Sequence, residues 1–288
     1  LLNTLFGNIS LQDGIRIEAI DWPDALLTTF GGPAFGLQGL RDCCRVDAGQ
    51  PLTSTALKPL GLDAGALARR AAAFAEGGID LIKDDHGVSD QSAAPFQERL
   101  RRCQEAVTLA NQRTGGHSLY LPNVTAPPQQ LAERLQAAVN AGCTGVLLCP
   151  WLCGLGSVRW ARDGFGLAVM AHPALTGALF RPGHGFRPAV LLGELFRIAG
   201  ADAVIYPNVG GRFGFDLDTC QEINAALRGP LGGLRPAAPT AGGGIRLGDA
   251  GHWLEHYGPD TIFLIGGSLY AEGDLRAASA QLRNALGR

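Results

Sequence analysis

The feature that most constrains the fold is an alternation of short apolar runs with longer segments of helical period, repeated along most of the 288 residues. Short β-branched runs, each followed by a helix, indicate parallel strands covered by helices. The eight predicted strands span residues 52–58, 79–85, 118–125, 145–152, 167–173, 203–209, 239–245 and 261–267. Eight such units within about 240 residues match the usual size of a TIM barrel, so we predict an α/β fold of the (β/α)₈ class.

The segments between these strands carry the start and stop signals of helices. The predicted helices span residues 63–75, 95–113, 129–141, 157–162, 187–199, 217–228, 248–256 and 274–286. Asp63 and Asp274 stand where a side-chain oxygen can accept hydrogen bonds from the first free N–H groups. Gly77, Gly142 and Gly200 stand where helices end.

Residues 1–51 do not join the alternation; they hold Pro23, a Gly-Gly-Pro turn at 31–33 and one helical patch. We expect them to be a lead-in that crosses the bottom of the barrel or links it to another domain, with the catalytic barrel at 52–288. The opening Leu-Leu-Asn is neither an initiator methionine nor a charged signal-peptide start. We therefore expect further sequence to precede Leu1.

Charge and hydropathy limit the partners. The net charge is −2 and no basic stripe is present, which argues against nucleic-acid binding. Gly and Pro interrupt the longest apolar stretches before they reach the roughly 20 residues of a membrane span, so no membrane segment is predicted. Small molecules and copies of the chain itself remain as the expected partners.

The seven cysteines are odd in number, irregularly spaced and mostly set in apolar runs. This pattern is typical of reduced thiols, so we place the protein in the cytoplasm. Cys149 and Cys153 could suggest a metal site. No second Cys/His pair lies nearby at zinc-finger spacing, and packing is the favoured interpretation.

Polar residues gather where the predicted strands end, which is where barrel enzymes build their active sites. They are Lys58, Lys83, Asp85, His86, Asn123, His172 and Asn208, with Arg212 in the following loop. Each alone is typical of a solvated or structural side chain. Two lysines, an aspartate and two histidines in one mouth would be costly to desolvate without a metal or an anionic ligand. We expect Asn123, Asn208 and Arg212 to bind substrate.

Glycines end the last two predicted strands, at 242–244 and at 266–267. Barrel enzymes often bind phosphate there through exposed backbone N–H groups, although tight turns alone would explain the same glycines. Asp85, with a neighbouring histidine or a modified lysine, offers ligands for Mg²⁺. A desolvated Lys58 near that cation would have a lowered pKa and could transfer protons.

Several segments together resemble the barrel of the RuBisCO large subunit and its non-carboxylating, RuBisCO-like relatives. They are FGN at 6–8, ALKPLGL at 56–62, GGIDLIKDD at 77–85, YLPNVT at 120–125, MAHP at 170–173, ADAVIYPN at 201–208, GGRF at 210–213 and LIGG at 264–267. The resemblance covers nearly the whole chain. The family's smaller N-terminal α+β domain is not among these residues.

The resemblance implies a Mg²⁺ enzyme that acts through an enolate on a phosphorylated keto-sugar derivative. Lys83 matches the lysine that CO₂ converts to a metal-binding carbamate, Asp85 matches a metal ligand, and His86 takes the third ligand position. Lys58 matches a proton-transferring lysine and His172 a substrate-binding histidine. The phosphate-binding backbone is matched by Gly243, Gly244, Gly266 and Gly267.

Asn8 matches an asparagine that reaches the active site of the neighbouring subunit. The resemblance therefore implies a homodimer whose active sites are shared between subunits.

The departures from the carboxylases concern charged residues of the mouth. His86 stands in place of a glutamate, and the second lysine after the Lys-Pro pair is missing. Pro173 and Thr176 replace an arginine and a histidine, and Ile205 replaces another histidine. We therefore expect no ribulose-bisphosphate carboxylase activity.

The Lys-Asp-Asp-His-Gly segment at 83–87 resembles the RuBisCO-like group of apiose catabolism. This predicts decarboxylation of 3-oxo-isoapionate 4-phosphate, with transcarboxylation and hydrolysis of the same substrate as an alternative. A second alternative is the 2,3-diketo-5-methylthiopentyl-1-phosphate enolase, or a methylthioribulose-phosphate isomerase, of methionine salvage. An alternative of another class is a non-catalytic barrel that only binds sugar phosphates.

Overall fold

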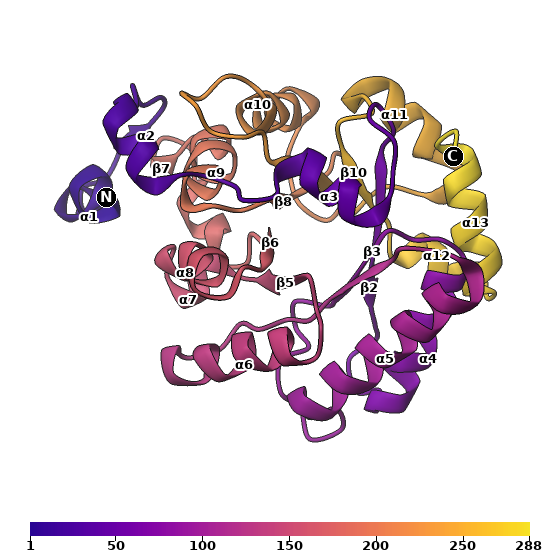
Figure 1. Cartoon of the computed structure of the whole chain (residues 1–288). Coiled ribbons are helices and arrows are strands. Elements are labelled where there is room, and N and C mark those ends of the chain that lie inside the picture. Colours follow the sequence, from indigo (N-terminus) through magenta and orange to yellow (C-terminus); the bar gives the residue numbers. More distant parts are fainter.

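The computed structural model describes residues 1–288, and its centre is a barrel of eight parallel strands (Figure 1). The strands are β2 (Leu52–Leu57), β3 (Leu81–Asp84), β4 (Leu119–Leu121), β5 (Gly145–Leu148), β6 (Ala168–Ala171), β8 (Ala203–Pro207), β9 (Ala238–Gly242) and β10 (Ile262–Leu264). They are ordered β4-β3-β2-β10-β9-β8-β6-β5. The ring closes between β4 and β5, because Val124 N–H donates to Leu147 O and Leu147 N–H donates to Pro122 O.

All eight predicted strands and the (β/α)₈ class are confirmed, but the strands end earlier than the sequence suggested. The largest overestimates, of four residues, are at 118–125, where β4 ends at Leu121, and at 145–152, where β5 ends at Leu148 and α7 (Pro150–Cys153) follows. Proline has no N–H to donate to a strand partner, and its fixed φ suits the first turn of a helix. The apolar run therefore continues through a change of secondary structure.

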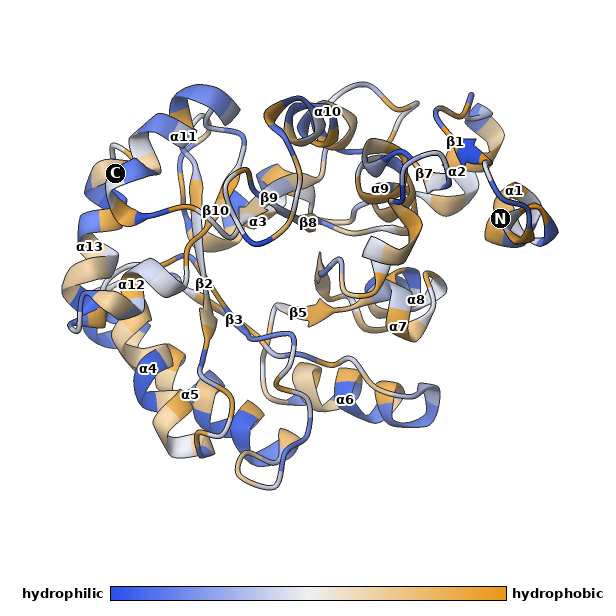
Figure 2. Cartoon of the chain, turned by 180° about the vertical axis from the view of Figure 1, so that it is seen from behind, coloured by the Kyte–Doolittle hydropathy of each residue, from blue (hydrophilic) through white to orange (hydrophobic).

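The predicted helices are also present around the barrel. They are α4 (Ala64–Glu76), α5 (Phe96–Thr114), α6 (Pro128–Asn140), α8 (Gly156–Phe165), the π-helix η3 (Ala189–Leu195) continued by α9 (Phe196–Ala199), α10 (Leu217–Arg228), α11 (Ala250–Tyr257) and α13 (Leu275–Ala285). Asp63 and Asp274 accept hydrogen bonds from the first turns of α4 and α13, as predicted. In Figure 2 hydrophilic and hydrophobic residues alternate along these helices, as expected where one face is buried.

The first 51 residues contain more structure than the single predicted helical patch. They form α1 (Leu2–Phe6), η1 (Asn8–Leu11), β1 (Arg16–Ile17), α2 (Asp24–Phe30) and α3 (Gly36–Cys44). Strand β1 pairs in parallel with β7 (Gly185–Phe186), in the loop that follows β6. The sequence did not reveal this two-stranded sheet, since each strand is only two residues long.

Helix α3 closes the bottom of the barrel, the end at which the strands begin. Leu37, Leu40 and Cys44 of α3 are buried in one cluster with Leu52 and Leu81, which begin β2 and β3. A second and larger cluster fills the space between the strands and the surrounding helices. The opposite end, the mouth, is left for the βα loops. The division into parts 1–51 and 52–288 stays a prediction.

All seven cysteines are free thiols, and Cys149 is fully buried in the core. No helix combines the length and the apolar character needed to cross a membrane. The cytoplasmic location stays a prediction.

Candidate active site at the barrel mouth

Lys83 is the deepest charged residue of the mouth. Alternate residues of β3 point into the barrel, so the Lys83 side chain points inward, and it is 2% exposed. Its Nζ donates one hydrogen bond, to Asp84 O at 3.1 Å. Burial lowers the pKa of Lys83 to about 8, with the Lys58 charge acting in the same direction and Asp85 opposing it. A larger fraction of this amine than of an ordinary lysine is therefore uncharged near neutral pH.

Asp84 points the other way, into the layer between the strands and the helices. Its carboxylate is fully buried and accepts hydrogen bonds from Arg99 Nε at 3.0 Å, Tyr120 Oη at 2.9 Å and the backbone N–H of Asn123 at 2.9 Å. With its oxygens taken, this carboxylate has a structural role.

Asp85 lies at the mouth among groups that can donate to it. Its Oδ1 accepts from Gly87 N–H at 3.1 Å and lies 3.2 Å from His86 Nδ1. Its Oδ2 lies 3.9 Å from Lys58 Nζ. Burial alone would raise the pKa of Asp85, but the hydrogen bonds from His86 and Gly87 and the Lys83 charge together hold it well below its usual value. Asp85 is therefore ionised, with lone pairs to spare.

The two histidines of the mouth are stacked. The rings of His86 and His172 lie 4.2 Å apart between centroids, with 12° between their planes. Burial, helped by the charges of Lys83 and His86, lowers the pKa of His172 well below its ordinary value. The N–H of Ala174 donates to His172 Nδ1 at 3.1 Å. A neutral imidazole that accepts at Nδ1 carries its proton on Nε2, so His172 presents a donor.

Asn123 does not present a free amide to a ligand. It is fully buried, and its Nδ2 donates to His86 O at 2.9 Å and to Val88 O at 3.1 Å. Its Oδ1 accepts from Thr125 N–H at 3.1 Å. The side chain therefore holds the loop that carries His86, and its predicted role in substrate binding stays untested.

A cavity of about 370 Å³ lies beside β8 and β9. It is lined by Pro207, Asn208, Gly210, Gly211, Arg212, Phe213, Gly242, Gly243 and Gly244. Gly244 has φ +76°, and a Cβ there would lie 2.7 Å from Gly211 N and 2.8 Å from Val209 O. Only glycine fits this position. Tyr257 Oη donates to Asn208 Oδ1, which fixes that amide.

Gly266 and Gly267 mark the start of α12 (Gly267–Ala271), directly after β10. A Cβ on Gly266 would lie 3.2 Å from Lys58 Nζ. The missing side chain therefore makes room for the lysine as well as for any phosphate.

Asn8 is the one predicted site residue that lies apart from the others. It is exposed in η1, directly after α1, and α1 lies at the edge of the molecule in Figure 1, away from β2 and β3. The other predicted residues flank the mouth of this chain's own barrel.

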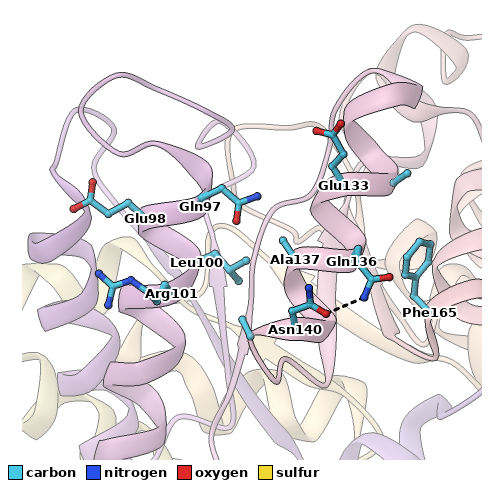
Figure 3. A pocket seen from close by; sticks show the side chains of 11 residues that line it. Gln97, Glu98, Leu100, Arg101, Glu133, Gln136, Ala137, Asn140 and Phe165 are labelled. Carbon is cyan, nitrogen blue, oxygen red and sulfur yellow. Dashed lines mark hydrogen bonds between the residues drawn. The ribbon is translucent and has the colours of Figure 1, made fainter.

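A larger cavity, about 950 Å³, lies elsewhere. It is a groove on the outer wall between α5 and α6, with Gln97 and Arg101 on one side and Glu133 and Gln136 on the other (Figure 3). None of the predicted site residues lines it. Its side chains do not combine an acid, a base and a nucleophile, so the mouth is the better candidate site.

The mouth can offer Mg²⁺ oxygen and nitrogen ligands, though not a complete set of ordinary ones. No group of three His, Cys, Asp or Glu side chains converges on one point. Asp85 and His86 would supply two donors, and a third would arise if CO₂ added to the uncharged Lys83 amine, which its lowered pKa favours. With that addition the residues fit a divalent cation.

The fold is thus a barrel of eight parallel strands whose mouth brings together two lysines, an aspartate and two histidines, with a glycine-lined cavity beside β8 and β9. The protein-family model described as the ribulose bisphosphate carboxylase large chain, catalytic domain, matches residues 37–286. The chain therefore belongs to the RuBisCO large-chain family, and RuBisCO-like proteins are among its relatives.

Two relatives and one solved structure show the kinds of protein that are similar. The 5-methylthioribulose-1-phosphate isomerase of Rhodospirillum rubrum is 43% identical over 275 residues, covering 95% of this chain and 72% of its own length. The 2,3-diketo-5-methylthiopentyl-1-phosphate enolase of Geobacillus kaustophilus is 31% identical, covering 95% and 67%. The crystal structure of a RuBisCO-like protein from Rhodopseudomonas palustris has a TM-score of 0.91 at 38% identity, covering 99% and 78%.

Sequence reasoning missed the residues that hold the site from behind: Arg70, Arg99, Tyr120, Arg134 and Tyr270. They come from helices or from the outer face of a strand. Attention to strand ends could not find them.

Proposed function

We propose that this protein is an enolate-forming enzyme that moves a proton on a phosphorylated methylthio-pentulose, with 5-methylthioribulose 1-phosphate as its substrate. The observation that carries the proposal is the Lys58 amine, held 3.9 Å from Asp85 at the mouth of a chain 43% identical to an isomerase named for this substrate. The expected main reaction, decarboxylation, becomes the second candidate.

In this proposal the uncharged form of the Lys58 amine takes the proton from the carbon beside the carbonyl group. The ammonium so formed then returns a proton to another carbon of the enolate, which gives the isomerised ketone. Asp85 keeps the amine near the reacting carbon, and the Nε2–H of His172 donates to a substrate oxygen. Donors aimed at an oxygen that gains negative charge stabilise the transition state more than the ground state. Proton transfer by a positioned side chain contributes about 10²–10⁴-fold to a rate.

The substrate phosphate would occupy the cavity beside Gly243 and Gly244, where Arg212 supplies positive charge. Asp85, His86 and carboxylated Lys83 would hold Mg²⁺, which when bound stabilises the charge of the enolate oxygen. Asn8 would complete the site of a neighbouring copy in a homodimer, which accounts for its place away from this chain's own mouth.

Decarboxylation of 3-oxo-isoapionate 4-phosphate is favoured by one observation, the stacking of His86 on His172. Because His86 stands in place of a carboxylase glutamate, a substrate carboxylate meets one negative charge fewer at this mouth. Loss of CO₂ from a β-keto acid gives the same kind of enolate as proton removal. The two candidates therefore share one site and differ in the bond that breaks.

The deciding experiment supplies each substrate with Mg²⁺ and bicarbonate in deuterated water. For 5-methylthioribulose 1-phosphate we expect isomerisation, observed by NMR, with no loss of carbon, and Lys58→Met abolishing it. CO₂ release from 3-oxo-isoapionate 4-phosphate without proton exchange on the first substrate would overturn the proposal. Binding of both without turnover would favour the non-catalytic barrel.

A further inference from the structure

Strand β2 carries Lys58 one residue beyond its own end, at a point where its neighbour β10 has already left the sheet. The pairing of the two strands ends at Leu264 and Ser54, and Ile265 N–H then donates to Ser54 O at 3.0 Å. After Gly266 the chain turns into α12. The next β2 groups on that side, Ala56 C=O and Lys58 N–H, therefore have no strand to pair with.

Tyr270 of α12 satisfies both of these groups. Lys58 N–H donates to Tyr270 Oη at 3.1 Å, and the same hydroxyl donates to Ala56 O at 3.0 Å. Burial raises the pKa of Tyr270 to about 12, so the hydroxyl keeps the proton that it donates. One side-chain oxygen thus replaces the missing strand.

Arg70 of α4 holds the backbone carbonyl group of Lys58. Its Nη1 donates to Lys58 O at 2.7 Å, and its guanidinium lies 5.6 Å from the centroid of the Tyr270 ring. The fully buried Phe74 packs edge-on against that ring, 5.4 Å between centroids. Both backbone polar groups of Lys58 are therefore held by side chains from two helices.

We propose that Tyr270 and Arg70 are positioning residues, which fix the backbone of Lys58 so that its amine lies over Gly266 and beside Asp85. This inference rests on the proposed function, since it assigns the two residues a role through the proton-transferring lysine. A flexible four-carbon side chain reaches one place reliably only when its own backbone is fixed. Misplacement of a reacting group by about 1 Å can cost on the order of 100-fold in rate.

The test is Tyr270→Phe, which keeps the ring against Phe74 and removes only the bridging hydroxyl. Tyr206→Phe is the matched control, because Tyr206 is fully buried and its hydroxyl has no hydrogen-bond partner. Arg70→Met, which keeps an apolar stem at a half-buried site, is the second variant in case Tyr270→Phe folds poorly.

Two measurements need no substrate. In Tyr270→Phe we expect faster hydrogen exchange at the amide of Lys58, and a changed rate of labelling of the Lys58 amine by an acylating reagent, each read by mass spectrometry. The Tyr206→Phe protein should match the wild type in both. Unchanged exchange and labelling in Tyr270→Phe and Arg70→Met would overturn the inference even if the proposed function holds.

The third measurement is turnover of 5-methylthioribulose 1-phosphate. We expect kcat to fall about tenfold in Tyr270→Phe and in Arg70→Met while KM stays within about twofold. Altered exchange with unchanged kcat would overturn the positioning role. A wild-type protein inactive on this substrate would count against the proposed function, and the exchange and labelling data would still decide whether the two residues fix Lys58.

Discussion

The two ends of the barrel use aspartate in different ways, as the residues before and after strand β3, Asp80 and Asp85, show. At the bottom, Asp80 Oδ2 accepts from Thr53 N–H and Thr53 Oγ1, both at 2.7 Å, and its Oδ1 accepts from Arg288 Nη2 at 3.0 Å. At the mouth, Asp85 has one backbone hydrogen bond, a histidine at 3.2 Å and a lysine at 3.9 Å. Satisfied lone pairs hold a fold together, whereas spare ones are available for chemistry.

The same contrast holds across the barrel. Asp202 at the bottom is fully buried and accepts from the N–H groups of Phe35, Gly36 and Val169, at 2.7 to 2.8 Å. At the mouth, His172 accepts a hydrogen bond at Nδ1, and its Nε2 has no hydrogen-bond partner in the protein. Burial alone does not identify a functional residue; the partners of the buried group do.

The largest expected effect is the loss of activity on Asp85→Asn. The neutral amide cannot stabilise the ammonium form of Lys58 by charge and is a weaker cation ligand than a carboxylate, so we expect turnover to fall about 10³- to 10⁴-fold. The melting temperature should stay within a few degrees, since few contacts of Asp85 hold the fold. Steady-state kinetics and thermal unfolding measure the two quantities. Wild-type turnover in this variant would show that Asp85 takes no part in catalysis.

Asp80→Asn should show the opposite result. It leaves the Arg288 guanidinium without its charge partner in a nearly buried site, which typically costs about 4 kcal/mol in the free energy of unfolding. Urea unfolding measures this loss, and kcat of the folded fraction should match the wild type. A fall in kcat with intact stability would show that the bottom is not purely structural.

Lys83 is expected to differ from Asp85 and Asp80 by making the stability of the fold depend on pH. Its pKa is about 8 in the folded chain against 10.5 for the free side chain, so the unfolded chain binds more protons between these values. The free energy of unfolding should therefore rise with pH from about 8 to 10.5, by about 3 kcal/mol for this group. Lys83→Met should remove that rise. Urea unfolding of both proteins across this pH range gives the difference, and parallel curves would refute the assignment.

The smallest effect concerns two glycines with positive φ. Gly244 at the mouth has φ +76° and Gly142 at the bottom has φ +80° with open space around it. Gly142→Ala should cost about 1 kcal/mol of stability through backbone strain, and Gly244→Ala should cost more, because its Cβ would also lie 2.7 Å from Gly211 N. Only Gly244→Ala should also raise KM, by about tenfold, because it narrows the phosphate cavity. Equal KM values for the two variants would move phosphate binding away from Gly244.

The sequence predicted the number and order of the barrel strands because each one carries its own apolar signal. It placed Asp85 rather than Asp84 at the mouth, since adjacent residues of a strand face opposite ways, but it could not reveal that Arg99 and Tyr120 hold the Asp84 carboxylate. Nor could it find Tyr270, 212 positions from Lys58, whose contact depends on where β10 stops. Strand ends were overestimated where apolar residues continue into a loop, as at Pro150.

Helix α3 seals the bottom with Leu37, Leu40 and Cys44, so the mouth is the only entrance to the interior of the barrel. A molecule that reaches Lys83 must leave by the route it entered. Product and incoming substrate therefore cannot pass each other, and departure of one must precede arrival of the next. Any segment that covers the strand ends would control both substrate entry and product release, and its opening rate would set an upper limit on turnover.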